Sequence, residues 1–165
     1  MRIAEFDTLA AEEAAALVRS CADIPSFATG VTDGRPYGSV GALLTAAREQ
    51  AGTWTDAEVQ AALADHPRIG ERPAGHGAGA GLSDREQAGV DPADAELQRR
   101  LADGNRRYEE RFGHIYLVRA AGRTGAELLE LLEQRLTNDP GTERAVTREQ
   151  LTEIALLRLE GLVTP

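Results

Sequence analysis

The sequence predicts an all-α fold, with residues 1–165 forming a single domain of several packed helices. Alanine, leucine, glutamate and arginine dominate the composition, and aromatic residues make up only 4%. Apolar residues recur at helical spacing in most segments. A chain of 165 residues has the length of one domain and can bury enough apolar surface to fold without cross-links.

Three helices are expected in the first 65 residues, over residues 10–20, 39–52 and 55–65. Asp7 is the candidate N-cap of the first helix and Ser39 that of the second. Thr55 and Glu58 have the spacing of a capping box at the start of the third. The prolines, glycines and aspartates within residues 22–36 predict a loop.

Three more helices are expected in the C-terminal half, over residues 91–111, 124–136 and 142–162. Asp91 followed by Pro92 is typical of an N-cap with proline at the first helical position. One face of that helix carries Leu97, Leu101, Asn105 and Tyr108. Residues 114–118 are the only strand-like run, and it is short.

The charge and the cysteine content exclude several classes of protein. A net charge of -9 argues against a nucleic-acid partner and against an anionic membrane surface. No apolar run approaches the roughly 20 residues needed to span a bilayer, and the N-terminus lacks the apolar core of a signal peptide. A single cysteine allows no intrachain disulfide. We therefore expect a cytoplasmic protein.

The segment from His66 to Gln87 is the strongest candidate for chemistry. A predicted helix ends near His66, and a new one opens with Ser83, followed by Glu86 and Gln87. An imidazole, a hydroxyl, a carboxylate and an amide are groups that move protons on a small polar molecule. Pro67 disfavours helical geometry at His66 and so fixes its direction.

Each of these groups also has a purely structural explanation. His66 can satisfy carbonyl groups at a helix C-terminus, and Ser83 and Glu86 have the spacing of a capping box. The glycine-rich residues 75–81 lack the Gly-Lys-Ser/Thr ending of a phosphate loop, which favours a surface loop or a lid. The local pattern leaves both explanations open.

Arg158 is flanked by apolar residues in the last predicted helix. If it is buried it needs a partner, and a carboxylate can hold a guanidinium through two hydrogen bonds. Alternatively, its stem covers the rim of the core while its head reaches solvent. No metal is expected, because the three histidines lack ligand spacing and the only cysteine, Cys21, is remote in sequence.

Five blocks of residues in this order resemble the 2-oxo-4-hydroxy-4-carboxy-5-ureidoimidazoline (OHCU) decarboxylase family. They are His66-Pro67-Arg68-Ile69-Gly70, Ser83 to Gly89, Arg111 to Leu117, Arg135 to Asp139, and Leu157-Arg158-Leu159. The family makes (S)-allantoin in urate degradation. The resemblance implies an all-α fold, a small-molecule ureide substrate, no metal or organic cofactor, and a homodimer.

The resemblance also implies roles for individual residues. The catalytic histidine of the family falls on His66 and its catalytic glutamate on Glu86. Its substrate-binding positions fall on Pro67, Ser83, Gln87 and Arg158, and on backbone groups near Ile115 and Tyr116. The alternatives are a hydrolase acting on a related ureide and a non-catalytic helical interaction module, which would have lost His66 or Glu86.

Overall fold

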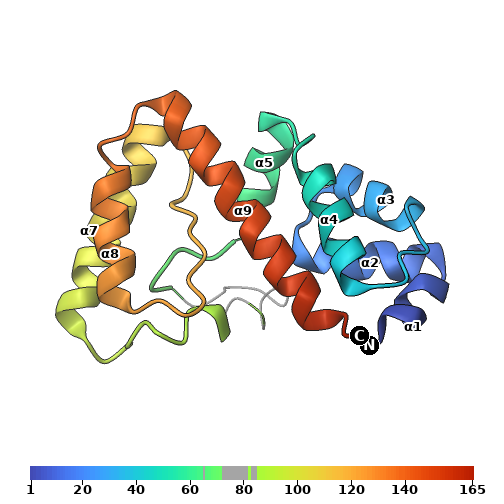
Figure 1. Ribbon diagram of the computed structural model, residues 1–165. Helices are drawn as coiled ribbons and strands as arrows, with labels where there is room; N and C mark the ends of the chain where they lie inside the picture. Colours follow the sequence, from blue (N-terminus) through green and yellow to red (C-terminus); the bar gives the residue numbers. More distant parts are fainter. Residues whose placement is uncertain (65, 72–81, 83–84) are drawn as a thin grey trace. The chain divides into compact units, whose positions relative to one another are not determined.

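The computed structural model describes residues 1–64, 66–71, 82 and 85–165. These residues are mostly helical, which confirms the all-α prediction (Figure 1). They form two compact units. Unit 1 comprises Met1–Ala62 with Leu151–Pro165, and unit 2 comprises Leu63–Gln150. That the whole chain folds as one domain stays a prediction.

Unit 1 is built from helices whose apolar faces pack together. They are α1 (Ile3–Thr8), α2 (Ala11–Cys21), α3 (Pro25–Asp33), α4 (Val40–Ala51), most of α5 (Asp56–Leu63) and the last part of α9 (Pro140–Leu162). Figure 1 shows α2, α3 and α4 side by side. The ring of Phe27 meets the only tryptophan, Trp54, edge to face at a centroid distance of 5.2 Å.

Two expectations for the N-terminal region are wrong. Residues 22–36 are not one loop, because α3 occupies Pro25–Asp33. Proline is tolerated at the start of this helix, and burial of Phe27 and Val31 outweighs the low helix propensity of its glycine and threonine. Asp7 does not cap the next helix either. It lies within α1, and its carboxylate accepts hydrogen bonds from the amides of Tyr37 and Gly38, both at 2.9 Å.

Two predicted caps in unit 1 are confirmed. The Ser39 hydroxyl accepts a hydrogen bond from the Ala42 amide at 3.2 Å and opens α4. Thr55 and Glu58 form the expected capping box, because the Glu58 carboxylate accepts from the Thr55 amide while the Thr55 hydroxyl accepts from the Glu58 amide. Local hydrogen bonds therefore determine where these helices begin.

Unit 2 contains α7 (Ala95–Phe112), α8 (Gly125–Arg135) and the first part of α9. Helices α7 and α8 pack side by side (Figure 1). Asp94, not Asp91, is the N-cap of α7, and it accepts from the Leu97 amide at 3.0 Å. Asp91 instead bonds the Ala93 amide in a preceding turn at 2.8 Å. The predicted start was therefore about one turn too early.

Residues 114–118 form no strand. Among the residues that the structure describes, the only β-bridge joins Arg2 and Thr164. The side chains of Tyr116, Leu117 and Val118 are buried in or beside the core of unit 2. Residues of a type that is common in strands thus pack here onto the core of unit 2, and they do so without pairing to a neighbouring strand.

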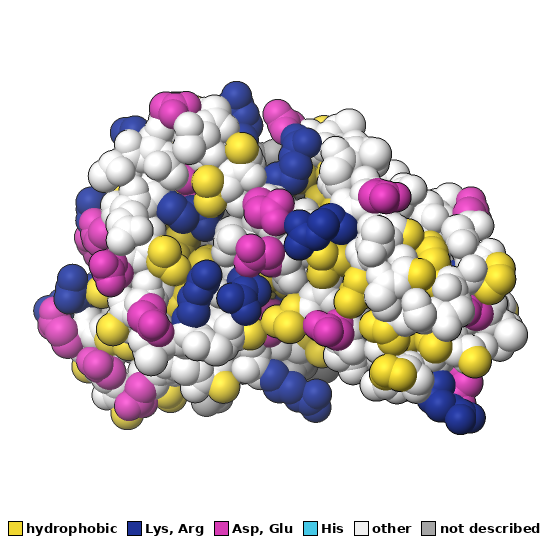
Figure 2. Space-filling view, in the orientation of Figure 1, with side chains coloured by type: hydrophobic (Ala, Val, Ile, Leu, Met, Phe, Trp, Pro, Cys, Tyr) yellow, Lys and Arg dark blue, Asp and Glu magenta, His cyan; other side chains and the backbone are white. Residues whose placement is uncertain are grey.

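The two ends of the described chain meet in unit 1, where they are marked N and C in Figure 1. The Ile3 amide donates to the Thr164 carbonyl at 2.8 Å, and the Thr164 amide donates to the Met1 carbonyl at 2.8 Å. On the face shown in Figure 2, acidic and basic side chains are intermixed. No helix among the described residues is long and apolar enough to cross a membrane.

Candidate active site

His66 lies between the end of α5 and a tight turn. Its amide donates to the Leu63 carbonyl at 3.2 Å, so the helix ends just before the histidine, close to where the sequence predicts. The residue is half-buried, and its Nε2 atom is buried. Pro67 follows and fixes the backbone torsion φ at its own position. The backbone is therefore restrained on both sides of His66.

The turn after Pro67 requires a glycine. The Glu71 amide donates to the Arg68 carbonyl at 3.0 Å, which closes a β-turn. Gly70, the third residue of that turn, has φ of +89°, and a positive φ at this position is characteristic of type II turns. A Cβ on Gly70 would also lie 3.0 Å from the Gln98 Oε1 atom. Both the torsion and the available space therefore favour glycine here.

One stripe of α7 holds this turn. The Asn105 Nδ2 donates to the Ile69 carbonyl at 3.0 Å. The Glu109 carboxylate accepts two hydrogen bonds from Arg68, from Nε at 2.5 Å and from Nη2 at 3.0 Å. Residues four apart lie on the same face of a helix. Arg68 and Ile69, which are consecutive in the β-turn, therefore contact Glu109 and Asn105, which are one helical turn apart in α7.

The pair of Arg68 and Glu109 also determines the charges beside the turn. Hydrogen bonding from Arg68 lowers the pKa of the Glu109 carboxyl, and the same contact raises the pKa of the Arg68 guanidinium. Both side chains are partly exposed, so solvent screens the attraction. Each group remains charged over the whole range in which enzymes usually work.

Gln87 links the second predicted block to this turn. Its side-chain Oε1 accepts from the Gly70 amide at 2.9 Å, and its Nε2 donates to the Arg68 carbonyl at 3.3 Å. Glu86 precedes it, is helical and is half-buried. The structure thus brings the block that contains Glu86 and Gln87 to the turn that follows His66.

Two sequence predictions fall on residues outside the described part of the chain. One is Ser83, expected as a substrate ligand or a helix cap, and the other is the glycine-rich segment of residues 75–81. Both stay predictions.

Ile115 and Tyr116 belong to the same unit as His66 and Glu86. The Tyr116 side chain is 1% exposed, and its hydroxyl donates to the Leu128 carbonyl at 3.1 Å. The Ile115 carbonyl lies 3.0 Å from His114 Nδ1. Within the described part of the chain, the amides of Ile115 and Tyr116 have no hydrogen-bond partner. The Tyr116 side chain is therefore committed to the core, so that any role of this residue in binding falls to its backbone.

Arg158 lies in unit 1 and is buried, with 6% of its surface exposed. Its Nη1 donates to the Cys21 carbonyl at 3.3 Å. Of the two alternatives that the sequence left open for Arg158, the structure shows burial and not a head group in solvent. A guanidinium has several donors and can serve more than one partner.

Sequence reasoning missed the two α7 residues that hold the turn, Asn105 and Glu109. For Asn105 a signal was present, because it is a polar residue on the apolar face of a predicted helix. It is 3% exposed, and a buried amide calls for a specific hydrogen-bond partner. Glu109 carried no such signal, because charged residues are abundant along this helix.

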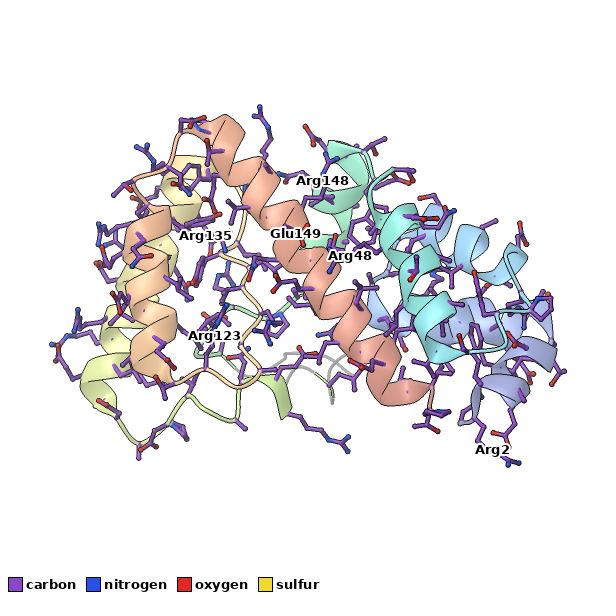
Figure 3. The ribbon with its side chains drawn as sticks, in the orientation of Figure 1. Arg2, Arg48, Arg123, Arg135, Arg148 and Glu149 are labelled. Carbon is purple, nitrogen blue, oxygen red and sulfur yellow. The ribbon has the colours of Figure 1, made fainter. Side chains whose placement is uncertain are left out.

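A buried cluster around Arg135 was also missed. Arg135 lies in the last turn of α8, and its side chain is buried within unit 2 (Figure 3). Its guanidinium donates to the carboxylate of Glu143 and to the Leu117 carbonyl, and it lies 4.9 Å from the centre of the Tyr116 ring. This cluster fixes the extended segment that carries Ile115 and Tyr116. Among the described residues, no three His, Cys, Asp or Glu side chains gather as metal ligands would.

The described residues define an all-α protein in which the block of Glu86 and Gln87 lies against the turn that follows His66. Residues 7–160 match the family model described as OHCU decarboxylase. The chain therefore belongs to the OHCU decarboxylase family. This result confirms the resemblance inferred from the five sequence blocks, and it favours a decarboxylase over the hydrolase and the interaction module.

Individual relatives agree with this assignment. The chain is 30% identical over 141 residues to an OHCU decarboxylase of Amia calva, a match that covers 84% of this chain and 81% of that protein. It is 32% identical to the uric acid degradation bifunctional protein TTL of Arabidopsis thaliana and 26% identical to a uric acid degradation bifunctional protein of a Bacillus strain. The match covers 61% of the chain for the first and 98% for the second, and in each case 32% of the longer relative.

Solved structures show the same fold. An OHCU decarboxylase crystallised in the presence of (S)-allantoin superposes with a TM-score of 0.75 at 26% identity, covering 87% of this chain and 94% of that one. An (S)-allantoin synthase superposes with a TM-score of 0.72 at 15% identity, covering 99% of this chain and 54% of that one. The second likeness, at this low identity, supports the fold alone.

Proposed function

We propose that this chain decarboxylates OHCU to (S)-allantoin, with His66 and Glu86 as its catalytic residues. Membership of the OHCU decarboxylase family supports the reaction. The observation that supports the residues best is the Gln87 side chain, which spans the turn after His66 with two hydrogen bonds. It ties the residue after Glu86 to the turn that begins two residues after His66.

The reaction places three demands on the protein. Loss of carbon dioxide leaves an electron pair, and the imine beside the carboxylated carbon of the substrate can accept it. The protein must therefore hold the carboxylate, manage the proton of the neighbouring hydroxyl, and protonate one face of the intermediate. Side chains can meet all three demands, so the proposal assigns no cofactor.

The roles follow from the chemistry of each group. His66 acts as acid or base on the substrate hydroxyl, because an imidazole exchanges protons near neutral pH. Glu86 polarises or protonates the ring and ureido nitrogens. Arg158 binds and orients the anion. Ser83, Gln87 and the amides near Ile115 and Tyr116 hold the ureido and ring groups, and Pro67 lines the site.

The roles of His66 and Glu86 are tested with His66→Ala and Glu86→Gln. Loss of one acid–base group should lower kcat by about 100-fold or more. Glu110→Gln is the matched control, because Glu110 forms only an exposed ion pair with Arg106, at 3.2 Å. A near-native rate for His66→Ala, with a native circular dichroism spectrum, would remove this residue from the mechanism.

The same reaction mixtures distinguish a decarboxylase from a ureide hydrolase. Decarboxylation releases carbon dioxide from the substrate carboxyl, whereas hydrolysis of a ureido group releases ammonia. Fresh OHCU is made from urate in situ, and both gases are quantified with and without the protein. Ammonia release in step with substrate loss would replace the proposed reaction by a hydrolysis.

We further propose a homodimer located in the cytoplasm. Support for the dimer comes from the family resemblance alone, and support for the location comes from the single cysteine, which allows no intrachain disulfide and fits a reducing compartment. Sedimentation equilibrium gives the mass in solution, which should be twice that of the chain. Cell fractionation gives the location.

A further inference from the structure

We propose that Asn105 and Glu109 of α7 are positioning residues that orient the His66 imidazole by holding the turn of residues 68–71. This inference rests on the proposed function of His66. Neither α7 residue has a role assigned by the sequence blocks that resemble the family. Both bind the backbone or the side chain of residues that directly follow Pro67.

The backbone provides a short path from the turn to the imidazole. His66 is anchored on one side by its hydrogen bond to the Leu63 carbonyl at 3.2 Å. On the other side only Pro67 separates it from Arg68, and the ring of Pro67 prevents rotation about φ. A rotation of the turn can therefore be taken up only at ψ of Pro67 or in the torsions of His66. Holding the turn restricts the positions available to the His66 backbone and so the directions in which its ring can point.

The α7 contacts cover successive residues of the turn. Glu109 holds the Arg68 side chain through two parallel hydrogen bonds, a geometry that fixes orientation as well as distance. Asn105 holds the Ile69 carbonyl at 3.0 Å. Gln87 then joins the Arg68 carbonyl and the Gly70 amide from the other side. The turn is thus fixed from two elements at once.

Asn105 is not explained by core packing alone. It is 3% exposed, and its Oδ1 atom is buried without a hydrogen-bond partner among the residues that the structure describes. Burying an amide oxygen in this way opposes folding. Its neighbours on the same helix face, Leu101 and Tyr108, belong to the apolar core. An apolar residue of similar size would serve packing better, whereas only a donor can hold the Ile69 carbonyl.

This reasoning separates a positioning role from a structural one. Asn105→Leu removes the unpartnered Oδ1 atom but also leaves the Ile69 carbonyl without its donor, so its two effects on the melting temperature oppose each other. In the folded protein it should lower kcat by about tenfold or more with KM changed less than about threefold, because a misplaced catalytic group affects the chemical step. A residue important only for folding would leave kcat of the folded fraction unchanged.

Glu109→Gln provides an independent variant. It removes the charge that holds Arg68 and should also lower kcat by about tenfold. Combined with Arg68→Met, it should add little further loss, because both substitutions break the same contact. Glu110→Gln is the matched control, since it removes a neighbouring charge whose partner, Arg106, lies away from the turn in an exposed pair. This control should keep native kcat.

Hydrogen exchange gives a readout that does not depend on catalysis. In Asn105→Leu and Glu109→Gln, the amides of residues 66–71 should exchange faster than in the wild type, while those of α8 (Gly125–Arg135) are unchanged. Native kcat in both variants, or unchanged exchange at residues 66–71, would overturn the inference. If the wild type fails to decarboxylate OHCU, the proposed function fails by itself, and the exchange data alone decide whether α7 holds this turn.

Discussion

Arg135 and Glu143 form an ion pair from which solvent is almost excluded. The Arg135 Nε donates to Glu143 Oε1 at 2.7 Å, and the two side chains are 8% and 0% exposed. The hydroxyls of Tyr108 and Thr147 contact the same pair, and Arg135 Nη1 donates to the Leu117 carbonyl. The charges are thus surrounded by hydrogen-bond partners, the condition under which a buried ion pair is tolerated.

Removing one partner of this pair should be strongly destabilising. Arg135→Met leaves a buried carboxylate without its counter-charge, and we expect a loss of about 3–5 kcal/mol in the free energy of unfolding. The double variant Arg135→Met/Glu143→Leu should recover part of this loss, because it removes the stranded charge. Urea unfolding of the two single variants and the double variant measures the coupling. Strictly additive losses would contradict a coupled pair.

The tyrosines should resist ionisation in alkali. Burial raises the pKa of Tyr108 and of Tyr116 well above the ordinary value, and burial also raises that of Tyr37. These are the three tyrosines of the chain. The folded state therefore binds the phenolic protons more tightly than the unfolded state, and stability falls as the pH rises above about 10.

Absorbance at 295 nm during an alkaline titration measures tyrosine ionisation directly. We expect the tyrosinate signals of Tyr108 and Tyr116 to appear together with the loss of helical circular dichroism, because both are buried. Ionisation of all three tyrosines near pH 10 while the helical signal stays native would contradict the expected burial.

In acid, the pair of Arg68 and Glu109 should lose its contribution to stability. The hydrogen bond from Arg68 holds the pKa of Glu109 below its ordinary value of 4.5. The folded state therefore binds this proton less tightly than the unfolded state. The resulting stability is present above about pH 4.5 and is lost as the pH falls through the lowered pKa.

The urea midpoint at several pH values between 7 and 3 tests this linkage. Glu109→Gln should show a flatter loss of stability in acid than the wild type. Arg68→Met should show the same flattening, because it removes the cause of the pKa shift. Equal slopes for the wild type and both variants would show that the pair is not linked to folding.

The turn after His66 should not tolerate a Cβ at Gly70. Its φ of +89° and the close approach of Gln98 Oε1 both oppose alanine, and we expect Gly70→Ala to cost about 1–2 kcal/mol or more. Gly161 in α9 is the matched control, because a Cβ there meets nothing within 4 Å. Gly161→Ala should be neutral or stabilising by about 0.5–1 kcal/mol. Thermal unfolding compares the two, and equal melting temperatures would contradict the required turn.

Elements with local signals could be predicted from the sequence. The periodic leucines of residues 124–136 identified α8, and capping residues identified the starts of α4 and α5. Helix α3 was missed because burial of Phe27 and Val31 outweighs its weak propensity. Residues 114–118 were interpreted as strand-like from their apolar and β-branched composition. In the structure the side chain of Arg135, and not a neighbouring strand, binds the backbone there, at the Leu117 carbonyl.

The candidate site shows the same limit. His66, Glu86 and Gln87 lie close together in the sequence, so their association could be inferred from one segment. The contact of Glu109 with Arg68 joins residues 41 positions apart. Nothing local marks Glu109 among the many charged residues of its helix, and only the fold brings it to the turn.

The most direct test of the central claim is the stereochemistry of the product. OHCU decays without enzyme, slowly, to racemic allantoin. The wild-type protein should accelerate this decay and give (S)-allantoin, measured by circular dichroism of the product as the reaction proceeds, because protonation on one face requires an ordered site. Racemic allantoin formed at the uncatalysed rate would contradict the account.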